Sequence, residues 1–249
     1  MNESPILQVR DLTKDFGGVR AVSQVSFDLN GGESLGVIGP NGSGKTTLVN
    51  LITGFTRPNQ GEVFFRQKKI TAMMPHRIAQ LGLSRTFQMA RPFYQLPAYK
   101  NLVIPLNSPR VKRLIGGRYG DRDSTAIDLL EEVGFERDSA VPFKPASILP
   151  NGYLKRLELA RALALRPDLI ILDELFSGLS MAEVASTVPI IEKLQSEGKT
   201  IIMIEHRLRE LFRIVDRVLV LNYGRKIAEG TPKEVMESEE VRGAYLGSE

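Results

Sequence analysis

Cysteine is absent from this sequence of 249 residues, so the chain has neither disulfides nor thiolate ligands for a metal ion. This absence fits a reducing compartment. Long apolar runs are absent too: LIIL and IIMI are among the longest, far below the roughly 20 residues of a membrane-spanning helix. The start, MNESPILQVRDL, lacks the basic segment and apolar core of a secretory signal. We therefore expect a soluble, cytoplasmic chain.

A strong charge of either sign is also missing. Lys and Arg number 33 against 29 Asp and Glu, and the net charge of +4 neither requires nor excludes a nucleic acid or a membrane surface as partner. With 42% hydrophobic and 25% charged residues, the composition is that of an ordinary globular protein. The length suits one large α/β domain, or one domain with a smaller lobe.

Short β-like segments alternate with turns at the start of the chain. ILQV, VSFDL and SLGVIG lie within residues 6–38, and GEVFFRQKKI reads as a further strand. In the second half, strands alternate with helices, which predicts a parallel sheet covered on both faces. The elements expected there are a strand at 169–172, a helix around 182–196, a strand at 200–204, a helix around 207–214, a hairpin turning at 222–224 and a polar C-terminal helix.

The stretch from 88 to 158 has a different texture and is rich in proline. A helix is expected near 125–133, and another from Tyr153 on, where apolar residues recur at helical spacing. The basic segment at 107–123 most simply forms a solvated surface loop.

A phosphate-binding motif follows the strand SLGVI. GPNGSGKTT fits the pattern G-x-x-x-x-G-K-[ST] in full and precedes an expected helix, TTLVNLIT. Glycines let backbone N–H groups curl around phosphate oxygens, and the helix N-terminus adds partial positive charge. Lys45 is expected to reach the β- and γ-phosphates, and Thr46 to hold Mg²⁺. The predicted nucleotide-binding residues are Gly39, Pro40, Asn41, Gly42, Ser43, Gly44, Lys45, Thr46 and Thr47.

A second motif, LIILDE, ends a strand in two carboxylates, Asp173 and Glu174. In enzymes with a phosphate-binding loop, a carboxylate at the end of a neighbouring strand anchors Mg²⁺ through water, which suits Asp173. Glu174 then takes a proton from the attacking water, or orients it. A strand that happens to end in acids is the alternative, and the phosphate-binding motif beside it argues against that reading.

With these motifs, the chain resembles the nucleotide-binding subunit of an ATP-binding-cassette (ABC) transporter over essentially its whole length. The resemblance implies a RecA-like α/β core of the P-loop NTPase class with an antiparallel β layer. Residues 1–88 and 159–249 would form this core, and residues 89–158 a helical subdomain, within a single ATPase domain. It implies Mg-ATP as the bound nucleotide and no nucleic-acid partner.

Further residues follow from the same resemblance. Gln88, in LSRTFQ, matches the Gln loop that links the Mg²⁺ site to the membrane partner, and His206, after TIIMI, matches the switch histidine that contacts the γ-phosphate. The other histidine, His76, is expected on the surface. Phe16 stands where the family stacks a ring on adenine; an ordinary core phenylalanine is the alternative. The implied catalytic residues are Lys45, Gln88, Glu174 and His206, and the implied metal ligands are Thr46, Gln88 and Asp173.

Within the family, LTKDFGGVRAV, PHRIAQLGLSRTFQ and EGTPKEVMESEEVRGAYLG look most like the ATPases of branched-chain amino-acid importers. Lipopolysaccharide-export ATPases share the C-terminal style but usually carry a different sequence before the Gln. The resemblance implies a place on the inner face of the membrane, with permease subunits and a solute-binding protein as partners. The segment 89–102 is the expected permease contact, although its aromatics Phe93, Tyr94 and Tyr99 fit the core of the helical subdomain equally well.

The signature turn departs from the family pattern. The family has Leu-Ser-Gly-Gly-Gln at the start of a helix that reaches across a dimer to the partner's γ-phosphate; this chain has Leu149, Pro150, Asn151, Gly152 and Tyr153. Pro150 offers neither a hydroxyl nor an N–H. Asn151 would either donate its amide to a phosphate or serve as the N-cap of the helix, and the N-cap is favoured.

The loop DELFSGLS departs as well, with Leu175 in place of the usual Pro and Ser180 where Asp is commonest. The residues that act on the chain's own nucleotide are therefore intact, and those lent to a partner's nucleotide are altered. This contrast favours a heterodimer with a second ATPase subunit. The alternative is a homodimer in which the altered turn still works.

Two other functions fit parts of the sequence. One is a regulatory subunit that binds nucleotide and barely hydrolyses it, which only the altered turn supports. The other is a cassette ATPase acting on nucleic acid or ribosomes; such proteins usually have two cassettes or a long coiled-coil insertion, and this sequence has neither.

Overall fold

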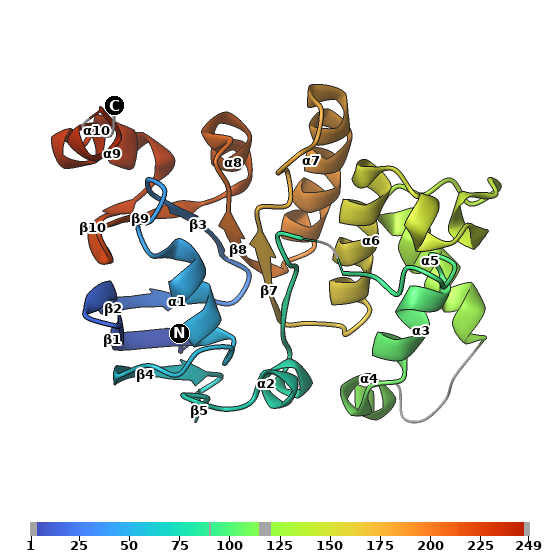
Figure 1. The fold of residues 1–249 in the computed structure, drawn as a ribbon, viewed down its shortest axis with the longest axis horizontal. Helices are drawn as coiled ribbons and strands as arrows, with labels where there is room; N and C mark the ends of the chain where they lie inside the picture. The colour runs from blue at the N-terminus through green and yellow to red at the C-terminus, as the bar shows by residue number, and fades with distance from the viewer. Residues whose placement is uncertain (1–3, 90, 115–120, 247–249) are drawn as a thin grey trace. The chain divides into compact units, whose positions relative to one another are not determined.

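The structure, a computed structural model, describes residues 4–89, 91–114 and 121–246 (Figure 1). The chain forms two compact units. Residues 1–78 and 198–249 make up the first unit, and residues 79–197 make up the second. Both units combine strands with helices, so the predicted α/β class is confirmed.

The first unit contains an antiparallel sheet with the strand order β2-β1-β4-β5. The strands are β1 (Leu7–Phe16), β2 (Val19–Leu29), β4 (Gln60–Phe65) and β5 (Lys68–Lys69). Val9 of β1 lies opposite Phe27 of β2 and Val63 of β4, and all three side chains are buried. These positions form the apolar face of the predicted antiparallel β layer.

A mostly parallel set of strands in the first unit carries the phosphate-binding motif. The strands are β3 (Ser34–Ile38), β8 (Thr200–Ile204), β9 (Arg217–Asn222) and β10 (Arg225–Gly230). β3 pairs in parallel with β8 and β9, while β10 pairs antiparallel with β9. Every residue of β3 and β8 is buried, as both faces of a parallel sheet usually are. The helices are α1 (Lys45–Ile52), α8 (Leu208–Ile214), α9 (Pro232–Glu237), α10 (Glu239–Leu246) and α2 (Pro75–Leu81), which begins in this unit.

The second unit pairs two parallel strands and is otherwise helical. The strands are β6 (Leu83–Arg85) and β7 (Leu169–Asp173). The helices are α3 (Lys100–Leu106), α4 (Pro109–Leu114), α5 (Arg122–Glu132), α6 (Asn151–Leu163) and α7 (Met181–Ser196), with 3₁₀ turns at Val141–Phe143 and Ala146–Ile148. Leu157 and Ala160, expected on the apolar face of α6, are fully buried. The expectation that Lys155 and Glu158 lie on an opposite, polar face is wrong, because each is only 5% exposed.

The strands and helices expected from residue 169 onward are confirmed, including the turn at 222–224 between β9 and β10. One expectation is wrong. Part of the basic segment at 107–123 is helix α4, in which Arg110 is only 8% exposed because its guanidinium binds Leu165 O, Arg166 O and the Asp168 carboxylate. Residues 115–120 of that segment lie outside the described residues. The division at 89–158 stays a prediction.

Among the described residues, no helix is both long and apolar enough to span a bilayer.

Candidate functional site

The phosphate-binding loop connects the end of β3 to the start of α1. Three of its glycines have positive φ: Gly39 (151°), Gly42 (78°) and Gly44 (102°). A Cβ on Gly39 would lie 2.1 Å from Leu221 O, and one on Gly44 would lie 2.4 Å from Ala21 O. Because these contacts are with backbone atoms, neither position accepts a side chain. The loop is therefore built for close approach of backbone N–H groups to a ligand.

Lys45 is the buried cation of the loop, with 6% of its surface exposed. Its Nζ donates to Gly39 O at 2.8 Å and to Pro40 O at 3.0 Å, so the ammonium lies inside the curve of the loop. Thr46 is exposed at the first turn of α1, and that turn contains no acidic residue. An ammonium and the first-turn N–H groups of a helix beside a glycine loop make a site for phosphate.

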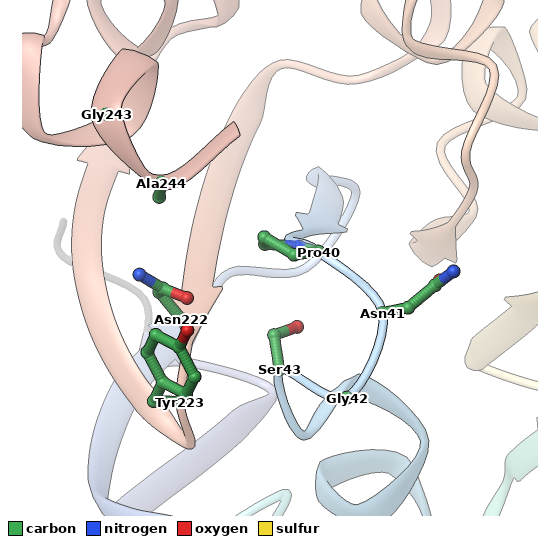
Figure 2. A pocket seen from close by; sticks show the side chains of 8 residues that line it. All are labelled: Pro40, Asn41, Gly42, Ser43, Asn222, Tyr223, Gly243 and Ala244. Atoms are coloured by element: carbon green, nitrogen blue, oxygen red, sulfur yellow. The ribbon is translucent and has the colours of Figure 1, made fainter. Parts of the chain in front are cut away.

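The hairpin turn between β9 and β10 contacts the phosphate-binding loop and supports its backbone. Gly224 N–H donates to Ser43 O at 3.0 Å. A pocket of about 170 Å³ lies between the loop and this turn (Figure 2). It is lined by Pro40, Asn41, Gly42, Ser43, Asn222, Tyr223, Gly243 and Ala244.

The C-terminal helix also contacts the loop, which the sequence did not indicate. The hydroxyl of Tyr245 on α10 accepts a hydrogen bond from the N–H of Gly39. Burial raises the pKa of Tyr245, and the hydrogen bond from Gly39 opposes that rise. The loop is thus supported by the turn between β9 and β10 and by α10, which come about 180 and about 200 residues after it in the chain.

Two other predicted residues lie on the surface of the first unit. Phe16 is 49% exposed with the Lys14 ammonium 5.0 Å from its ring centre, so the alternative of a core phenylalanine is wrong. His206 is exposed and follows β8, which is where the switch histidine was expected. His76 is exposed on α2, as predicted.

The acidic pair closes β7 in the second unit. Asp173 is 2% exposed, and Glu174 has a left-handed backbone with φ of 49°. This conformation strains a residue other than glycine and is often found at functional sites. Gln88 Nε2 donates to Glu174 Oε2 at 2.5 Å, so the structure brings these two predicted residues together.

Arg85 and Thr86, just before Gln88, contact Asp173 of the acidic pair. The sequence analysis used these two residues only as part of the resemblance to the importer ATPases. Arg85 Nη2 lies 2.6 Å from Asp173 Oδ2, and both side chains are buried. The backbone N–H of Asp173 donates to Thr86 Oγ1 at 3.1 Å. Both contacts arise because β6 and β7 are parallel neighbours whose carboxyl ends meet at one edge.

Lys155 is a second residue that the sequence reading missed. Its side chain is 5% exposed, and Nζ donates to Gln88 O at 2.6 Å and to Glu174 O at 3.1 Å. One ammonium on α6 therefore fixes the backbone of both residues. Nothing in the spacing of Lys155 marks it apart from the exposed lysines of the chain.

Replacing Lys155 with Met is expected to lower the free energy of unfolding by about 1–3 kcal/mol, because buried carbonyl groups lose their donor. Urea denaturation of the purified chain measures this change. Lys193→Met on α7 is the matched control: its side chain is 62% exposed and should change stability little. Equal stabilities of the two variants would show that Lys155 does not hold these carbonyls.

Three residues of the signature turn, Asn151, Gly152 and Tyr153, contact other residues of their own unit. Helix α6 starts at Asn151, and its N-cap is Pro150, which gives no side-chain hydrogen bond. The prediction that Asn151 caps the helix is wrong: Asn151 is the first helical residue, and its amide donates to Gly178 O at 3.0 Å. The extended backbone of Pro150 (ψ 156°) takes the capping position instead.

The N–H of Gly152 donates to the carboxylate of Glu183 on α7. A Cβ on Gly152 would lie 2.4 Å from Glu183 Oε1, so the close approach depends on glycine. Glu183 also accepts from Ser180 in a capping box, and the Ser180 N–H is the main reason why the pKa of Glu183 is lowered. Ser180, one of the noted departures, is thus the N-cap of α7.

The Tyr153 side chain contacts Phe135 and Glu136 instead of the N-terminus of α6. Its hydroxyl donates to the carboxylate of Glu136, at 2.8 Å from Oε2, and this hydrogen bond lowers the pKa of Glu136. The ring packs edge-on against Phe135, with centroids 4.9 Å apart. Leu175, the other departure, is buried with 2% exposure and belongs to the core.

Comparison with known families gives two matches. Residues 22–177 match the ABC transporter family, and residues 225–249 match the family described as branched-chain amino acid ATP-binding cassette transporter.

Individual proteins are similar over nearly the whole chain. The chain is 35% identical to the high-affinity branched-chain amino acid transport ATP-binding protein BraF of Pseudomonas aeruginosa, with 98% of both chains covered. It is 33% identical to the lipopolysaccharide export system ATP-binding protein LptB of Haemophilus influenzae, again with 98% of both covered. A crystal structure of an ATP-binding cassette of an ABC transporter in its ADP conformation aligns with a TM-score of 0.85 at 31% identity, covering 99% of this chain and 100% of the other.

Proposed function

The chain belongs to the ATPase subunits of ABC transporters, and on this premise we propose that it drives an importer of branched-chain amino acids or related small solutes, paired with a second, different ATPase subunit. The match of residues 225–249 to the branched-chain amino acid family supports an importer. Overall identity separates BraF from LptB by little, at 35% against 33%, so export of lipopolysaccharide remains the alternative.

The phosphate-binding loop is the observation that carries the nucleotide function. Gly39 and Gly44 accept no side chain, and the buried ammonium of the loop, on Lys45, lies within reach of the loop's own carbonyl groups. In the nucleotide complex, phosphate oxygens would replace Gly39 O and Pro40 O as the acceptors of hydrogen bonds from the Lys45 ammonium. The first-turn N–H groups of α1 would stabilise the same negative charge. In the same unit, Phe16 is proposed to stack on adenine and His206 to contact the γ-phosphate.

The second unit supplies the proposed hydrolytic groups. Gln88 and Glu174 already touch, and Glu174 is proposed to orient the attacking water. The proposed Mg²⁺ ligands are Thr46, Gln88 and Asp173, since oxygen donors suit this ion. When bound, Mg²⁺ neutralises charge that develops on the phosphates.

The contacts of the signature turn support the heterodimer. A turn that reaches a partner's γ-phosphate must leave hydrogen-bond donors free at the start of its helix. Here Pro150 has no N–H, Asn151 donates to Gly178 O, and Gly152 N–H donates to a carboxylate of its own chain. The partner's nucleotide would therefore meet a turn that lacks an N–H at Pro150 and in which the Asn151 side chain and the Gly152 N–H already have acceptors. Two alternatives remain compatible with this turn. One is a homodimer in which the altered turn still works, and the other is a regulatory subunit that hydrolyses little ATP.

The permease is proposed to dock on residues 89–102. Met89, Phe93 and Tyr94 are 71%, 45% and 47% exposed, which supports docking over the alternative of a buried core for these side chains. Tyr99 is partly buried, and its ring lies 5.5 Å from that of Phe143, so it fits the core of the second unit. Docking at this surface would hold the chain on the inner face of the membrane.

Lys45→Ala is expected to weaken ATP binding about tenfold or more, because each hydrogen bond to a charged group contributes about 1.5–3 kcal/mol. Titration of a fluorescent ATP analogue into the purified chain measures the dissociation constant. Lys233→Ala, in the same unit and exposed, removes an equal charge and should bind like the unaltered chain. ATP binding by Lys45→Ala at full affinity would mean that the nucleotide site lies elsewhere.

A further inference from the structure

The carboxylate proposed to anchor Mg²⁺ is already engaged by a cation of the chain itself. Arg85 Nη2 lies 2.6 Å from Asp173 Oδ2, and the two side chains are 7% and 3% exposed. Removing charges from water is costly unless they are paired, so this ion pair defines the position of both groups. Neither composition nor motif spacing had assigned Arg85 a role.

Neighbouring residues fix the guanidinium in place. Arg85 ends β6, whose partner β7 ends at Asp173, and Arg85 pairs in register with Ile171 two residues earlier. The guanidinium lies 5.2 Å from the ring centre of Phe87, within the range of cation–π attraction. Thr86 Oγ1 accepts the Asp173 N–H. Together with the Gln88–Glu174 contact, all four residues from Arg85 to Gln88 hold the acidic pair or one another.

We propose that Arg85 is a positioning residue for Asp173: it holds the carboxylate in place and opposes binding of a divalent cation there until Mg²⁺ arrives with ATP. The carboxylates of Asp173 and Glu174 carry negative charge, which attracts a divalent cation. A guanidinium bound to one of them reduces that attraction, since like charges repel strongly in a buried setting. Nucleotide phosphates add negative charge, which shifts the balance toward the metal. This inference rests on the proposed role of Asp173 in Mg²⁺ binding.

Mn²⁺ binding in the absence of nucleotide tests the proposal. Electron paramagnetic resonance of free Mn²⁺, titrated with the purified chain, gives the dissociation constant without relying on turnover. Arg85→Gln is expected to tighten Mn²⁺ binding about tenfold or more, because the opposing charge is gone. Arg85→Lys keeps the charge and is expected to bind Mn²⁺ as the unaltered chain does. Arg85→Gln combined with Asp173→Asn is expected to lose the gain.

If Arg85 only stabilised the fold, its replacement would weaken Mn²⁺ binding. Tighter Mn²⁺ binding by Arg85→Gln therefore distinguishes opposition to the metal from a purely structural role. Thermal unfolding establishes that each variant is folded, and Arg85→Ala replaces Arg85→Gln if the latter does not fold. Unchanged or weaker Mn²⁺ binding in a folded variant without the charge would overturn the proposal. A titration of the unaltered chain with the fluorescent ATP analogue is run in parallel. Absence of ATP binding there would refute the proposed function and leave the Mn²⁺ result as an independent answer about Arg85.

Discussion

Glu174→Gln is expected to reduce ATP hydrolysis about 10²- to 10⁴-fold, the usual contribution of a positioned general base. The substitution keeps the shape of the side chain and replaces the carboxylate with an amide, which accepts a proton poorly. ATP binding should persist, because Lys45 and the glycine loop are unchanged. Phosphate release from the transporter purified through a tag on this chain measures the rate. Glu132→Gln on α5, an exposed glutamate of the same unit, is the matched control.

Size-exclusion chromatography of Glu174→Gln in the presence of ATP shows whether this chain dimerises with itself or with a second ATPase subunit. A blocked hydrolytic step preserves the ATP-bound dimer, so the variant is expected to run as a monomer alone and as a dimer once the second subunit is added. A dimer formed by this chain alone, together with robust turnover of the unaltered chain, would favour the homodimer. Full turnover in Glu174→Gln would remove Glu174 from the mechanism altogether. No measurable turnover in the unaltered transporter would favour the regulatory subunit.

The phosphate-binding loop was predictable because its chemistry is local. Nine consecutive residues contain the glycines, the lysine and the hydroxyls, and the strand and helix on either side are marked by their own apolar patterns. The acidic pair was predictable for the same reason, as the end of an apolar strand. In each case, short-range sequence sets the backbone conformation that places the groups.

The supporting contacts were not predictable, since they join residues far apart in the chain. Arg85 reaches Asp173 across 88 residues, and Lys155 reaches Gln88 across 67. Periodicity indicates that a face is buried, but it does not name the partner on the other side. Asn151 was misassigned for a related reason: its preference for capping is local, while its actual acceptor, Gly178 O, lies 27 residues away.

Restoring the signature turn is expected to accelerate hydrolysis of the partner's nucleotide. Pro150→Ser returns an N–H and a hydroxyl at the start of α6, where serine is also a favourable N-cap. Tyr153→Gln returns an amide donor and gives up the hydrogen bond to Glu136 and the packing on Phe135. One recovered hydrogen bond to a charged phosphate is worth about 1.5–3 kcal/mol, or roughly 10- to 150-fold in the affinity of the closed state.

The measurement is sharpest in the Glu174→Gln background, where this chain's own nucleotide is no longer hydrolysed. Turnover that remains in the tagged transporter then comes from the partner's nucleotide, which faces Pro150 and Tyr153. Adding Pro150→Ser and Tyr153→Gln is expected to raise this residual rate. Tyr153→Phe serves as control, because it removes the contact with Glu136 without supplying a donor. A residual rate that stays the same in the restored transporter would mean that the altered turn does not limit hydrolysis, and the case for asymmetric sites would lose its physical basis.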